Sequence, residues 1–431
     1  MFLKKIYFII VSFIFIGCGA DSSTYNLNRD IENNKTDCSQ KEQNRVIYDK
    51  MKDSYLWYRY VPDIDYNSYS SIENLLNDLK YREYDKWSYI TSTDKYNNFY
   101  EKGVYEGYGF SIENYHNRIF ISYVYKNSPA DRAGLKRGTE ILEINNKSIS
   151  YIYDKQLWET VLKKNNETQL KILNNNIEKI VKIKKSSIKI SSIFFDKIIY
   201  LDNKKIGYFV LNRFIEPTRF ELKALFDKFK KEEIDELILD MRYNGGGRLS
   251  IANYLASLIG GENTEEMIFQ TLEYNDKHEN LNNNLIFSKE KNSLNLDRVF
   301  VISTKKTCSA SESLINGLKP YMSVNLIGSK TCGKPMGTRG VDFCDKHFSP
   351  IEFKTANVDG YSDYFEGIEP RCHVEDDIMH PLGDTNESML KESIFFIKYG
   401  ICSTVSKRFK EDINEETSPI LRGFQKEIDA I

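Results

Sequence analysis

Apolar positions in the second half of the chain follow two patterns that alternate along the sequence. Short, mostly apolar runs are typical of strands buried on both faces of a sheet, and they occupy 205–211, 237–240, 299–302 and 324–328. The more mixed segment 348–353 is also predicted to be a strand. Segments with apolar residues spaced as on one helix face occupy 216–231, 251–258, 312–318 and 390–397. This alternation of strands and helices predicts an α/β core over 188–402. The polar stretch 262–293 is predicted to be an irregular surface excursion.

The first residues have the composition of a targeting segment. Lys4 and Lys5 precede an apolar run that is too short to span a bilayer, so 1–17 is predicted to be an export signal. The run F-I-G-C that ends at Cys18 resembles the lipid-attachment sequence of bacterial lipoproteins. That resemblance implies a lipid anchor on Cys18 and a location on a bacterial membrane, facing the periplasm or the cell surface. The alternative is a cleaved signal followed by an incidental cysteine.

Three further regions are defined by polarity and spacing. Residues 18–43 are polar and predict a flexible tether. Residues 44–103 carry apolar side chains at helical spacing, and they predict a small helical region in which Trp57 and Trp87 belong to the core. The charged segment 403–431 is predicted to be an extension.

Length and charge narrow the classes of function. A chain of 431 residues is expected to form more than one domain. Its formal net charge of −2 gives no reason to expect nucleic acid or an acidic surface as a partner. No run of Cys, His or acidic residues has the spacing of a metal site, so neither a metal nor another cofactor is predicted.

Ser309 lies at a predicted strand-to-helix junction, where a serine can be activated. The strand 299–302 ends shortly before it and the helical pattern 312–318 begins shortly after it. A helix start offers free backbone N–H groups and the positive end of the helix dipole, so the amide of Ala310 could hold a developing oxyanion. The alternative is that Ser309 only caps the helix, which is the common role of serine at such a position.

Two other motifs accompany this serine in the sequence. The run D-M-R-Y-N-G-G-G occupies 240–247, and G-K-P at 333–335 places Lys334 in a second Gly-flanked loop. Together with S-A-S-E at 309–312, they resemble the D-L-R-x-N-x-G-G, S-A-S-E and G-K-G pattern of the C-terminal processing (tail-specific) peptidases, which are S41-type serine peptidases with a PDZ domain. The resemblance covers about 44–397 and implies a multidomain α/β fold whose catalytic part is 188–402.

The resemblance implies catalysis by a Ser–Lys dyad. Ser309 Oγ attacks a peptide carbonyl, and Lys334 takes its proton. Because a solvated lysine is charged near neutral pH, this mechanism needs an amine that is buried and kept away from Asp and Glu. The triple glycine fits a sharp turn that lets the backbone approach the substrate, so the amide of Gly246 is expected to pair with that of Ala310 as an oxyanion hole.

The sequence departs from the family pattern at two positions. The family often has Gly after the lysine, and four positions beyond the lysine a Gln that orients the amine; here these positions hold Pro335 and Thr338. The hydroxyl of Thr338 could still bond the amine, so Thr338 is predicted as the third member of the site. The same departures support an alternative function, a catalytically inactive peptide-binding lipoprotein on the same fold.

Residues 104–187 resemble a PDZ domain. Gly107, Tyr108, Gly109 and Phe110 would form its carboxylate-binding loop, and 154–163 would be the helix beside the peptide groove. The resemblance implies that the C-terminal segment of a protein substrate adds a strand along this groove. The alternative is a small β domain that binds no ligand.

The seven cysteines suggest disulfides. If Cys18 carries a lipid, six remain, and an even number fits disulfide pairing in an exported protein. The predicted pairs are Cys344–Cys372 and Cys308–Cys332, the second because Ser309 and Lys334 must come together and carry their neighbours with them. The alternative is free thiols.

A Ser–His hydrolase is the rival mechanism, because His347, His373 and His380 all follow Ser309. No G-x-S-x-G sequence surrounds Ser309, however, and none of these histidines lies in a recognisable motif. The prediction is therefore a serine endopeptidase that hydrolyses exported proteins through a Ser–Lys dyad.

Overall fold

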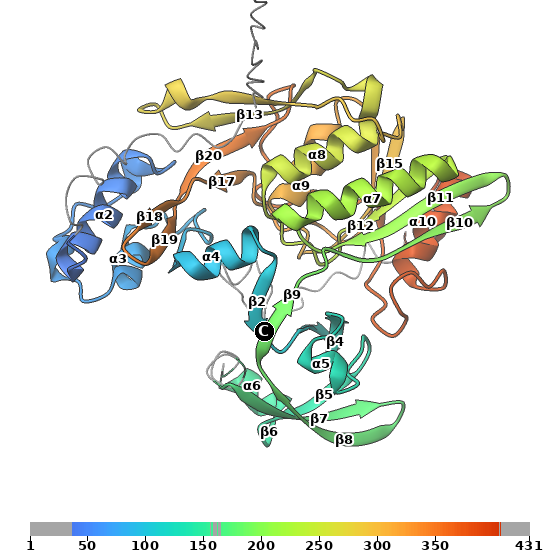
Figure 1. Cartoon of the computed structure of the whole chain (residues 1–431), viewed down its shortest axis with the longest axis horizontal. Helices are drawn as coiled ribbons and strands as arrows, with labels where there is room; N and C mark the ends of the chain where they lie inside the picture. The colour runs from blue at the N-terminus through green and yellow to red at the C-terminus, as the bar shows by residue number, and fades with distance from the viewer. Residues whose placement is uncertain (1–36, 156, 158–161, 163–164, 405, 407–431) are drawn as a thin grey trace, which may run out of the picture.

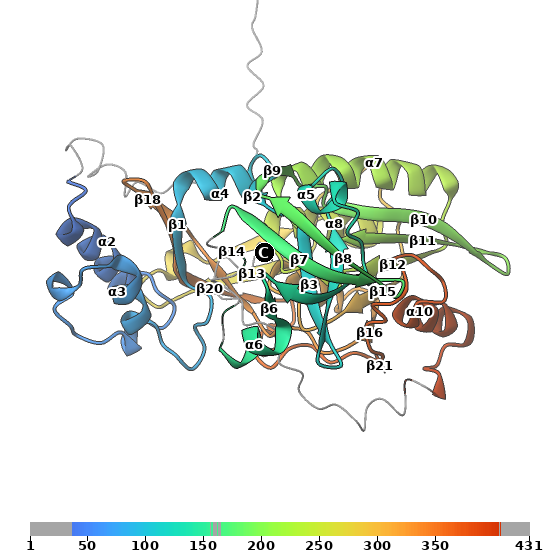
Figure 2. The ribbon, with the colours of Figure 1, turned by 90° about the horizontal axis from the view of Figure 1, so that it is seen from below.

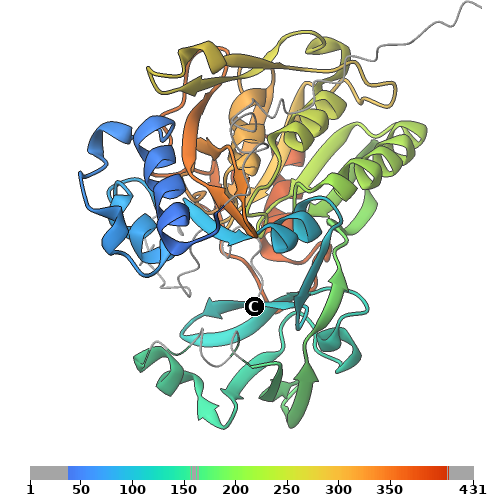
Figure 3. The ribbon, with the colours of Figure 1, turned by 60° about the vertical axis from the view of Figure 1, so that its left-hand side comes forward.

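The computed structural model describes residues 37–155, 157, 162, 165–404 and 406 (Figure 1). The predicted export signal, Cys18, most of the tether, most of the groove helix and nearly all of the charged extension lie outside these residues. None of the helices in the described part combines the length and the apolar character that crossing a bilayer requires. Figures 1 and 3 show three parts: a helical N-terminal region in blue, a PDZ-like domain in teal and green, and the predicted catalytic part.

The N-terminal region contains the helices α2 (Gln40–Asp53), α3 (Ile72–Leu79) and α4 (Thr93–Tyr100) and the 3-10 turns η1 (Tyr58–Tyr60) and η2 (Tyr66–Ser68). Each α-helix begins after a serine whose hydroxyl accepts a hydrogen bond from the first turn, as N-caps do. Apolar side chains of α2 and α3 pack with Phe348 and Ile351 of the catalytic part. The two regions therefore share one hydrophobic core.

A small sheet and a disulfide also tie the N-terminal region to the catalytic part. β1 (Tyr89–Ser92) pairs antiparallel with β19 (Lys346–Ser349), which pairs with β18 (Val341–Phe343). Cys38, just before α2, forms a disulfide with Cys344 in the turn between β18 and β19. The predicted pair Cys344–Cys372 is wrong, because Cys372 lies on an edge strand of a different sheet, where it is bonded to Cys402.

The PDZ-like domain is an antiparallel sheet in the order β3-β4-β5-β7-β8. Its elements are β3 (Phe110–Tyr115), β4 (Arg118–Val124), α5 (Pro129–Arg132), β5 (Glu140–Ile144), β6 (Lys147–Ser148), α6 (Ile149–Asp154), β7 (Glu167–Asn174) and β8 (Ile177–Lys184). β2 (Val104–Gly107) and β9 (Ser186–Lys189) pair antiparallel where the chain enters and leaves the domain. These two strands form the stem that connects the domain to the rest (Figure 1).

The catalytic part is built on a sheet in the order β10-β11-β12-β15-β16-β21. Its strands are β10 (Ile193–Leu201), β11 (Lys204–Leu211), β12 (Glu236–Asp240), β15 (Arg298–Ser303), β16 (Ser323–Gly328) and β21 (Cys372–His373). The β10–β11 pair is antiparallel, and the other neighbours are parallel. Apolar residues on both faces of the central strands explain their continuous hydrophobic runs.

Helices cover both faces of this sheet. α7 (Glu216–Glu232), α8 (Leu249–Gly260) and α9 (Ala310–Leu318) pack on the face that carries Leu237, Leu239 and Val301. α10 (Ser388–Tyr399) packs on the other face, against Ile238, Phe300 and Ile302. Figure 2 shows α7 and α10 on opposite sides of the sheet. The strand period of two therefore divides each central strand between two cores, and the predicted α/β core is confirmed.

A second sheet, in the order β14-β13-β20-β17, corrects two predictions. It contains β13 (Ile268–Tyr274), β14 (Asn283–Ile286), β17 (Met336–Thr338) and β20 (Ile351–Ala356). The stretch 262–293 is thus not all irregular, because β13 pairs with the distant β20, a partner that local composition cannot show. The predicted strand 348–353 is instead split between β19 and β20 at Pro350, which has no N–H for a ladder bond.

Candidate active site

Ser309 stands immediately before α9, where the sequence places it. β15 ends at Ser303, a short loop follows, and Ala310 is the first residue of the helix. The backbone of Ser309 has φ 55° and ψ −116°, a conformation that residues with a Cβ rarely adopt. A strained serine at a strand-to-helix turn is typical of an exposed nucleophile, and Ser309 is half exposed.

Gly246 lies directly against this serine. A Cβ at Gly246 would come within 2.8 Å of Ser309 Cβ and 3.1 Å of the Ala310 nitrogen, so only glycine fits there. Among the residues that the structure describes, the Ala310 amide has no hydrogen-bond acceptor. The Gly246 amide, in contrast, donates to Asn244 Oδ1 at 2.9 Å. The two predicted oxyanion donors therefore lie together, and the Gly246 amide must leave Asn244 before it can serve.

Three hydrogen bonds connect the turn after β12 to the loop and first helical turn around Ser309. Thr307 Oγ1 donates to the carbonyl of Met241 at 2.8 Å, and the Cys308 amide donates to the carbonyl of Asn244 at 3.0 Å. The hydroxyl of Ser311 donates to the same carbonyl at 3.0 Å. The D-M-R-Y-N-G-G-G motif thus fixes the position of the serine, which explains why the two motifs occur in one chain.

Glu312 connects the serine loop to the lysine loop, a role that the sequence analysis did not assign. One carboxylate oxygen, Oε2, accepts the amide of Ser309 and the amide of Lys334, each at 2.9 Å. The other oxygen accepts the amide of Gly333 at 2.8 Å and the hydroxyl of Thr331 at 2.6 Å. The backbone nitrogens of Ser309 and Lys334 thus lie no farther apart than twice 2.9 Å.

Glu312 is fully buried, and none of its described hydrogen-bond donors is a cation. Burial raises its pKa from the ordinary value, although the hydrogen bonds from Thr331, Lys334, Gly333 and Ser309 act in the opposite direction. The sequence did carry a signal for this residue, because a Glu three positions after a helix-capping serine is the pattern of a capping box.

A disulfide joins the same two loops. Cys308 precedes the serine, Cys332 precedes the lysine loop, and the two form a disulfide with a Cα–Cα distance of 5.2 Å. The predicted pair Cys308–Cys332 is therefore confirmed. The loops are held together covalently by this bond and non-covalently by Glu312.

Lys334 is buried, with 2% of its surface exposed. Its Nζ lies 4.9 Å from the centre of the Trp87 ring, which comes from the N-terminal region. Trp87 is itself buried, as predicted, but the sequence analysis did not place it at the site. Nothing in the local sequence signals this contact, because it depends on how the N-terminal region packs on the catalytic part.

The remaining predicted residues lie around this centre. Thr338 is half exposed on β17, and its hydroxyl has no hydrogen-bond partner among the described residues. The carbonyl oxygen of Pro335 accepts a hydrogen bond from the amide of Thr355 at 2.9 Å. His347 Nδ1 and His380 Nδ1 lie 2.6 Å and 2.7 Å from Asp342 and Asp377, respectively.

None of the hydrogen bonds between described residues joins Ser309 to His347, His373 or His380. The Ser–His alternative thus finds no partner histidine in the described part of the chain.

A cluster of ion pairs, called the charged junction below, surrounds Arg242 in the turn after β12. Arg242 is completely buried, and its guanidinium donates to Asp240 and to Glu387 at 2.8 Å each and to Asp376 at 2.7 Å. Arg137 of the PDZ-like domain donates to Asp376 at 2.6 Å. These arginines hold the pKa of Asp376 well below its ordinary value, against the opposing effect of burial. The junction links the PDZ-like domain to the turn that supports Ser309.

The predicted carboxylate-binding loop lies between β2 and β3. Gly109 has φ 90°, and a Cβ there would lie 2.1 Å from Ser128 Cβ, so this loop packs closely on the start of α5. Tyr108 is buried, and its hydroxyl donates to the carbonyl of Asn165 at 2.7 Å. Phe110 begins β3, which stands at one end of the sheet order. The four residues therefore stand where strand addition to the sheet would begin.

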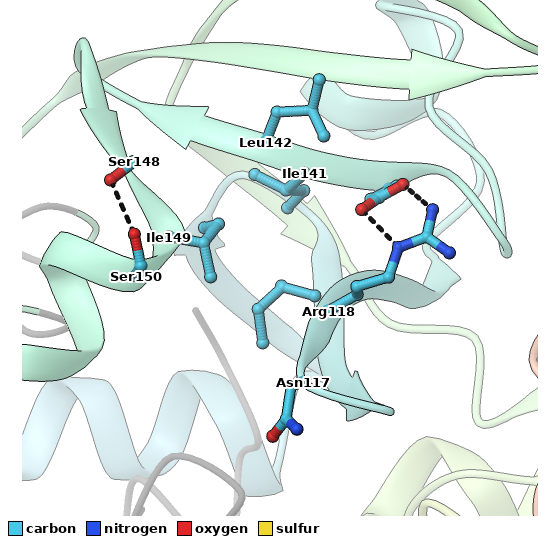
Figure 4. A pocket seen from close by; sticks show the side chains of 9 residues that line it. Asn117, Arg118, Ile141, Leu142, Ser148, Ile149 and Ser150 are labelled. Carbon is cyan, nitrogen blue, oxygen red and sulfur yellow. Dashed lines mark hydrogen bonds and ion pairs between the residues drawn. The ribbon is translucent and has the colours of Figure 1, made fainter.

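A small pocket of about 220 Å³ also opens on the PDZ-like domain, and none of the four loop residues lines it. Figure 4 shows Ile141 and Ile149 in its wall and Arg118 at its side. Arg118 Nε donates to Glu140 at 2.7 Å, so its charge is already paired. The pocket is smaller than the usual site for a small molecule, and it is not a site that the sequence predicted.

Comparison with known families places three domains in the order that the sequence suggests. The description "Peptidase S41 N-terminal domain" matches residues 42–89, "PDZ domain" matches 100–173, and "Peptidase family S41" matches 205–374. Ser309, Lys334, Gly246 and Thr338 all fall within the last of these matches.

Individual relatives agree with this result. A "Probable CtpA-like serine protease" of Staphylococcus aureus (strain COL) is 27% identical over 346 residues, which are 79% of this chain and 66% of the relative. A protein of the same description from Staphylococcus epidermidis (strain ATCC 12228) is 28% identical over 306 residues, covering 70% of this chain and 59% of that relative. The chain therefore spans at most about two thirds of the length of these curated relatives.

Solved structures show the same fold. The "Putative S41 protease" from Bacteroides fragilis NCTC 9343 is 28% identical, with a TM-score of 0.67 over 83% of this chain and 98% of that chain. The "photosystem II D1 C-terminal processing protease" is 17% identical, with a TM-score of 0.51 over 78% of this chain and 93% of that one. The second likeness concerns the fold alone.

Proposed function

Because the chain belongs to peptidase family S41, we propose that it is a serine endopeptidase in which Ser309 and Lys334 form the catalytic dyad. The observation that carries this proposal is the shared carboxylate of Glu312, which holds the amides of both residues on one oxygen at 2.9 Å. Two loops distant in sequence are thereby brought to one point, and the buried amine of Lys334 belongs to one of them.

The chemistry proceeds by acyl transfer. Ser309 Oγ attacks the carbonyl carbon of a peptide bond while Lys334 accepts the hydroxyl proton. The Ala310 amide donates to the oxyanion at the start of α9, where the helix dipole adds to its effect. Lys334 returns the proton to the leaving amine, and water then hydrolyses the ester on Ser309. The position of Lys334 supports this role, because Glu312 and the Cys308–Cys332 disulfide join its loop to the serine loop.

The substrates that fit this proposal are exported proteins. The PDZ-like domain would capture their C-terminal segments by strand addition at β3, with the loop Gly107–Phe110 receiving the terminal carboxylate. The signal-like segment 1–17 and Cys18 support export and a lipid anchor on a bacterial membrane, facing the periplasm or the cell surface. Disulfides among the described cysteines agree with an oxidising compartment.

A second candidate function is a peptide-binding lipoprotein without turnover. It is favoured by Thr338, which stands where the family often has Gln and whose hydroxyl has no hydrogen-bond partner among the described residues. In that case, the PDZ-like domain would bind C-terminal peptides while Ser309 remained unreactive.

Hydrolysis of an unfolded protein separates the two functions. Wild-type protein should degrade reduced, unfolded substrate, and Ser309→Ala and Lys334→Ala should each abolish this activity. Lys305→Ala is the matched control, because this exposed lysine lies in the serine loop without the contacts described above. A reactive-serine probe should label wild type but not Ser309→Ala. Retained peptide binding with neither hydrolysis nor labelling would establish the second function instead.

A further inference from the structure

Five aromatic side chains form a continuous layer on the N-terminal region and the adjacent loop of the catalytic part. Tyr60 stacks on Tyr81 with ring centres 4.2 Å apart, and Trp57 stacks on Tyr84 at 6.0 Å. Tyr81 and Tyr84 are 5.7 Å apart, and Tyr84 lies 5.0 Å from Phe365. These five residues are called the aromatic surface below. It is open to solvent, because Tyr60 is 62% exposed and Tyr84 is 38% exposed.

The aromatic surface reaches the lysine loop of the candidate active site. The carbonyl oxygen of Phe365 would lie 2.0 Å from a Cβ at Gly333, the residue that precedes Lys334. Trp57, Tyr81, Phe365 and the disulfide residue Cys332 also pack against one hydrophobic core that contains Cys308 and Trp87. A polypeptide chain that passes the dyad on this side would therefore meet these rings next.

Carboxylates border the aromatic surface. Tyr81 donates its hydroxyl to Glu83. Glu83, and after it Asp363 and Glu366, raise the pKa of Tyr84 by their negative charge. Three cations that neighbour this region in sequence are paired elsewhere, Arg59 with Asp276 at 2.8 Å, Arg82 with Asp78 at 3.2 Å and Lys330 with Glu369 at 2.6 Å, whereas Lys86 is exposed. The three carboxylates that act on Tyr84 thus outnumber the one neighbouring lysine, Lys86, that has no ion pair among the described residues.

Aromatic faces beside carboxylates favour one kind of partner. A guanidinium or ammonium group is attracted to the face of Tyr or Trp and at the same time to a neighbouring carboxylate. The stem of an Arg or Lys side chain can in addition cover apolar ring surface while its charged end stays in water. An uncharged apolar side chain gains only the second of these interactions, and an acidic one is repelled.

We propose that the aromatic surface is a substrate-binding subsite that selects an arginine or lysine side chain of the polypeptide held at the Ser309–Lys334 dyad. This inference rests on the proposed function for the identity of the substrate. It adds a specificity that neither the dyad nor the PDZ-like domain provides: recognition of a basic residue close to the cleaved bond, in addition to capture of a C-terminus.

Binding to the Ser309→Ala protein tests this subsite without any need for turnover. The probes are short fluorescent peptides, blocked at both ends to avoid capture of a C-terminal carboxylate, with arginine or its neutral analogue citrulline moved along the sequence. At one position, arginine should bind about three- to tenfold more tightly than citrulline. Equal affinity at every position would overturn the proposal.

Variants assign the preference to the aromatic surface. Tyr84→Ala and, separately, Glu83→Gln with Glu366→Gln should each reduce the arginine-to-citrulline ratio towards one in the Ser309→Ala background. Tyr200→Ala is the matched control, because Tyr200 is 71% exposed on β10 and lies in neither the site nor the surface. Tyr84→Leu should act like Tyr84→Ala, and unchanged melting temperatures show that the variants remain folded. A ratio that survives Tyr84→Ala would remove the subsite from this surface.

Hydrolysis of the same peptides by the protein with Ser309 intact separates the two proposals. If hydrolysis occurs and the ratio of kcat/KM for arginine and citrulline peptides falls in Tyr84→Ala, both stand. If hydrolysis occurs and this ratio is unaffected, the subsite is wrong and the peptidase stands. If no peptide is cleaved while arginine is preferred in binding, the subsite stands on a protein that only binds peptides.

Discussion

Two junctions of buried polar residues position the candidate active site, and they differ in charge. One holds a single carboxylate among neutral donors, and the other holds arginines paired with carboxylates. The junction at Glu312 joins the serine and lysine loops through a carboxylate that accepts only amide and hydroxyl donors among the described residues. The junction at Arg242 joins the β12 turn, α10 and the PDZ-like domain through two arginines and three carboxylates. Glu312 and Arg242 are fully buried, whereas the side chain of Asp376 is 13% exposed.

The difference shows in the pKa of each junction. Burial raises the pKa of Glu312, because its neutral donors compensate the lost hydration only in part. At the other junction, Arg137 and Arg242 outweigh burial and lower the pKa of Asp376. The carboxylate of Glu312 thus has no cation among its described hydrogen-bond donors. The contact between the PDZ-like domain and the β12 turn, in contrast, is made by ion pairs. The junction at Glu312 therefore joins the two loops without placing a second cation among its described hydrogen-bond donors.

The largest effect should come from breaking the charged junction. Arg242→Met leaves Asp240, Asp376 and Glu387 buried with their main cation missing, which should cost about 3–5 kcal/mol of unfolding free energy. Chemical denaturation measures this cost. Arg45→Met removes surface ion pairs with Glu42 and Asp49 on α2 and should change stability by less than about 1 kcal/mol. Equal costs for the two variants would show that the buried junction contributes no more than a surface ion pair.

The disulfide at the junction at Glu312 should rank next. Replacing Cys308 and Cys332 together by alanine removes the covalent link between the two loops and should cost about 2–4 kcal/mol. Hydrolysis should persist at a reduced rate, because Glu312 still joins the loops. Complete loss of activity in a folded double variant would mean that the carboxylate alone does not hold the dyad. The control pair is Cys372→Ala with Cys402→Ala, which removes a disulfide away from the site.

Glu312→Gln should have a smaller effect on stability and a large effect on activity. The amide group of glutamine keeps one acceptor oxygen but turns an NH2 group towards backbone N–H donors, so some of the four hydrogen bonds are lost, at about 1–3 kcal/mol. Because Ser309 and Lys334 both depend on Oε2, hydrolysis should fall by more than the stability loss explains. Unfolding and hydrolysis are measured on the same preparation. Full activity in Glu312→Gln would separate the carboxylate from the dyad.

The two junctions should respond to pH in opposite directions. Folding raises the pKa of Glu312 above its ordinary 4.5, so its contribution is fully present below that pH and is lost as the pH rises through the folded value. Folding lowers the pKa of Asp376 below its ordinary 3.8, so its contribution is present above that pH and is lost as the pH falls.

Unfolding curves between acidic and neutral pH test these signs. The cost of Glu312→Gln relative to wild type should shrink as the pH rises, and the cost of Asp376→Asn should shrink as the pH falls. Parallel behaviour of the two variants would contradict the electrostatic distinction between the junctions.

The sequence predicts the parts of the site that local patterns encode. The strand-to-helix position of Ser309 and the α/β core follow from apolar runs and helical spacing, and Cys308–Cys332 follows from the requirement that the two loops meet. The features that the sequence does not predict depend on contacts between residues that are far apart in the chain. The wrong pair Cys344–Cys372 and the missed β13 strand both involve partners that only the folded chain brings together. Glu312 lay within a recognised motif, but its second partner loop is set by tertiary structure.

Trp87 is the clearest case of such a distant partner, and Trp87→Phe should give the smallest effect. Phenylalanine retains an aromatic face near Lys334 Nζ but leaves part of the indole volume empty. Stability should fall by about 1 kcal/mol, and hydrolysis by about three- to tenfold, because the smaller ring packs less closely on the amine and water can approach it. Trp57→Phe changes a tryptophan of the same region that does not cover the amine, so its catalytic rate on substrates without basic residues should be unchanged. Equal losses in the two variants would assign the effect to the core of the N-terminal region instead of to the contact with Lys334.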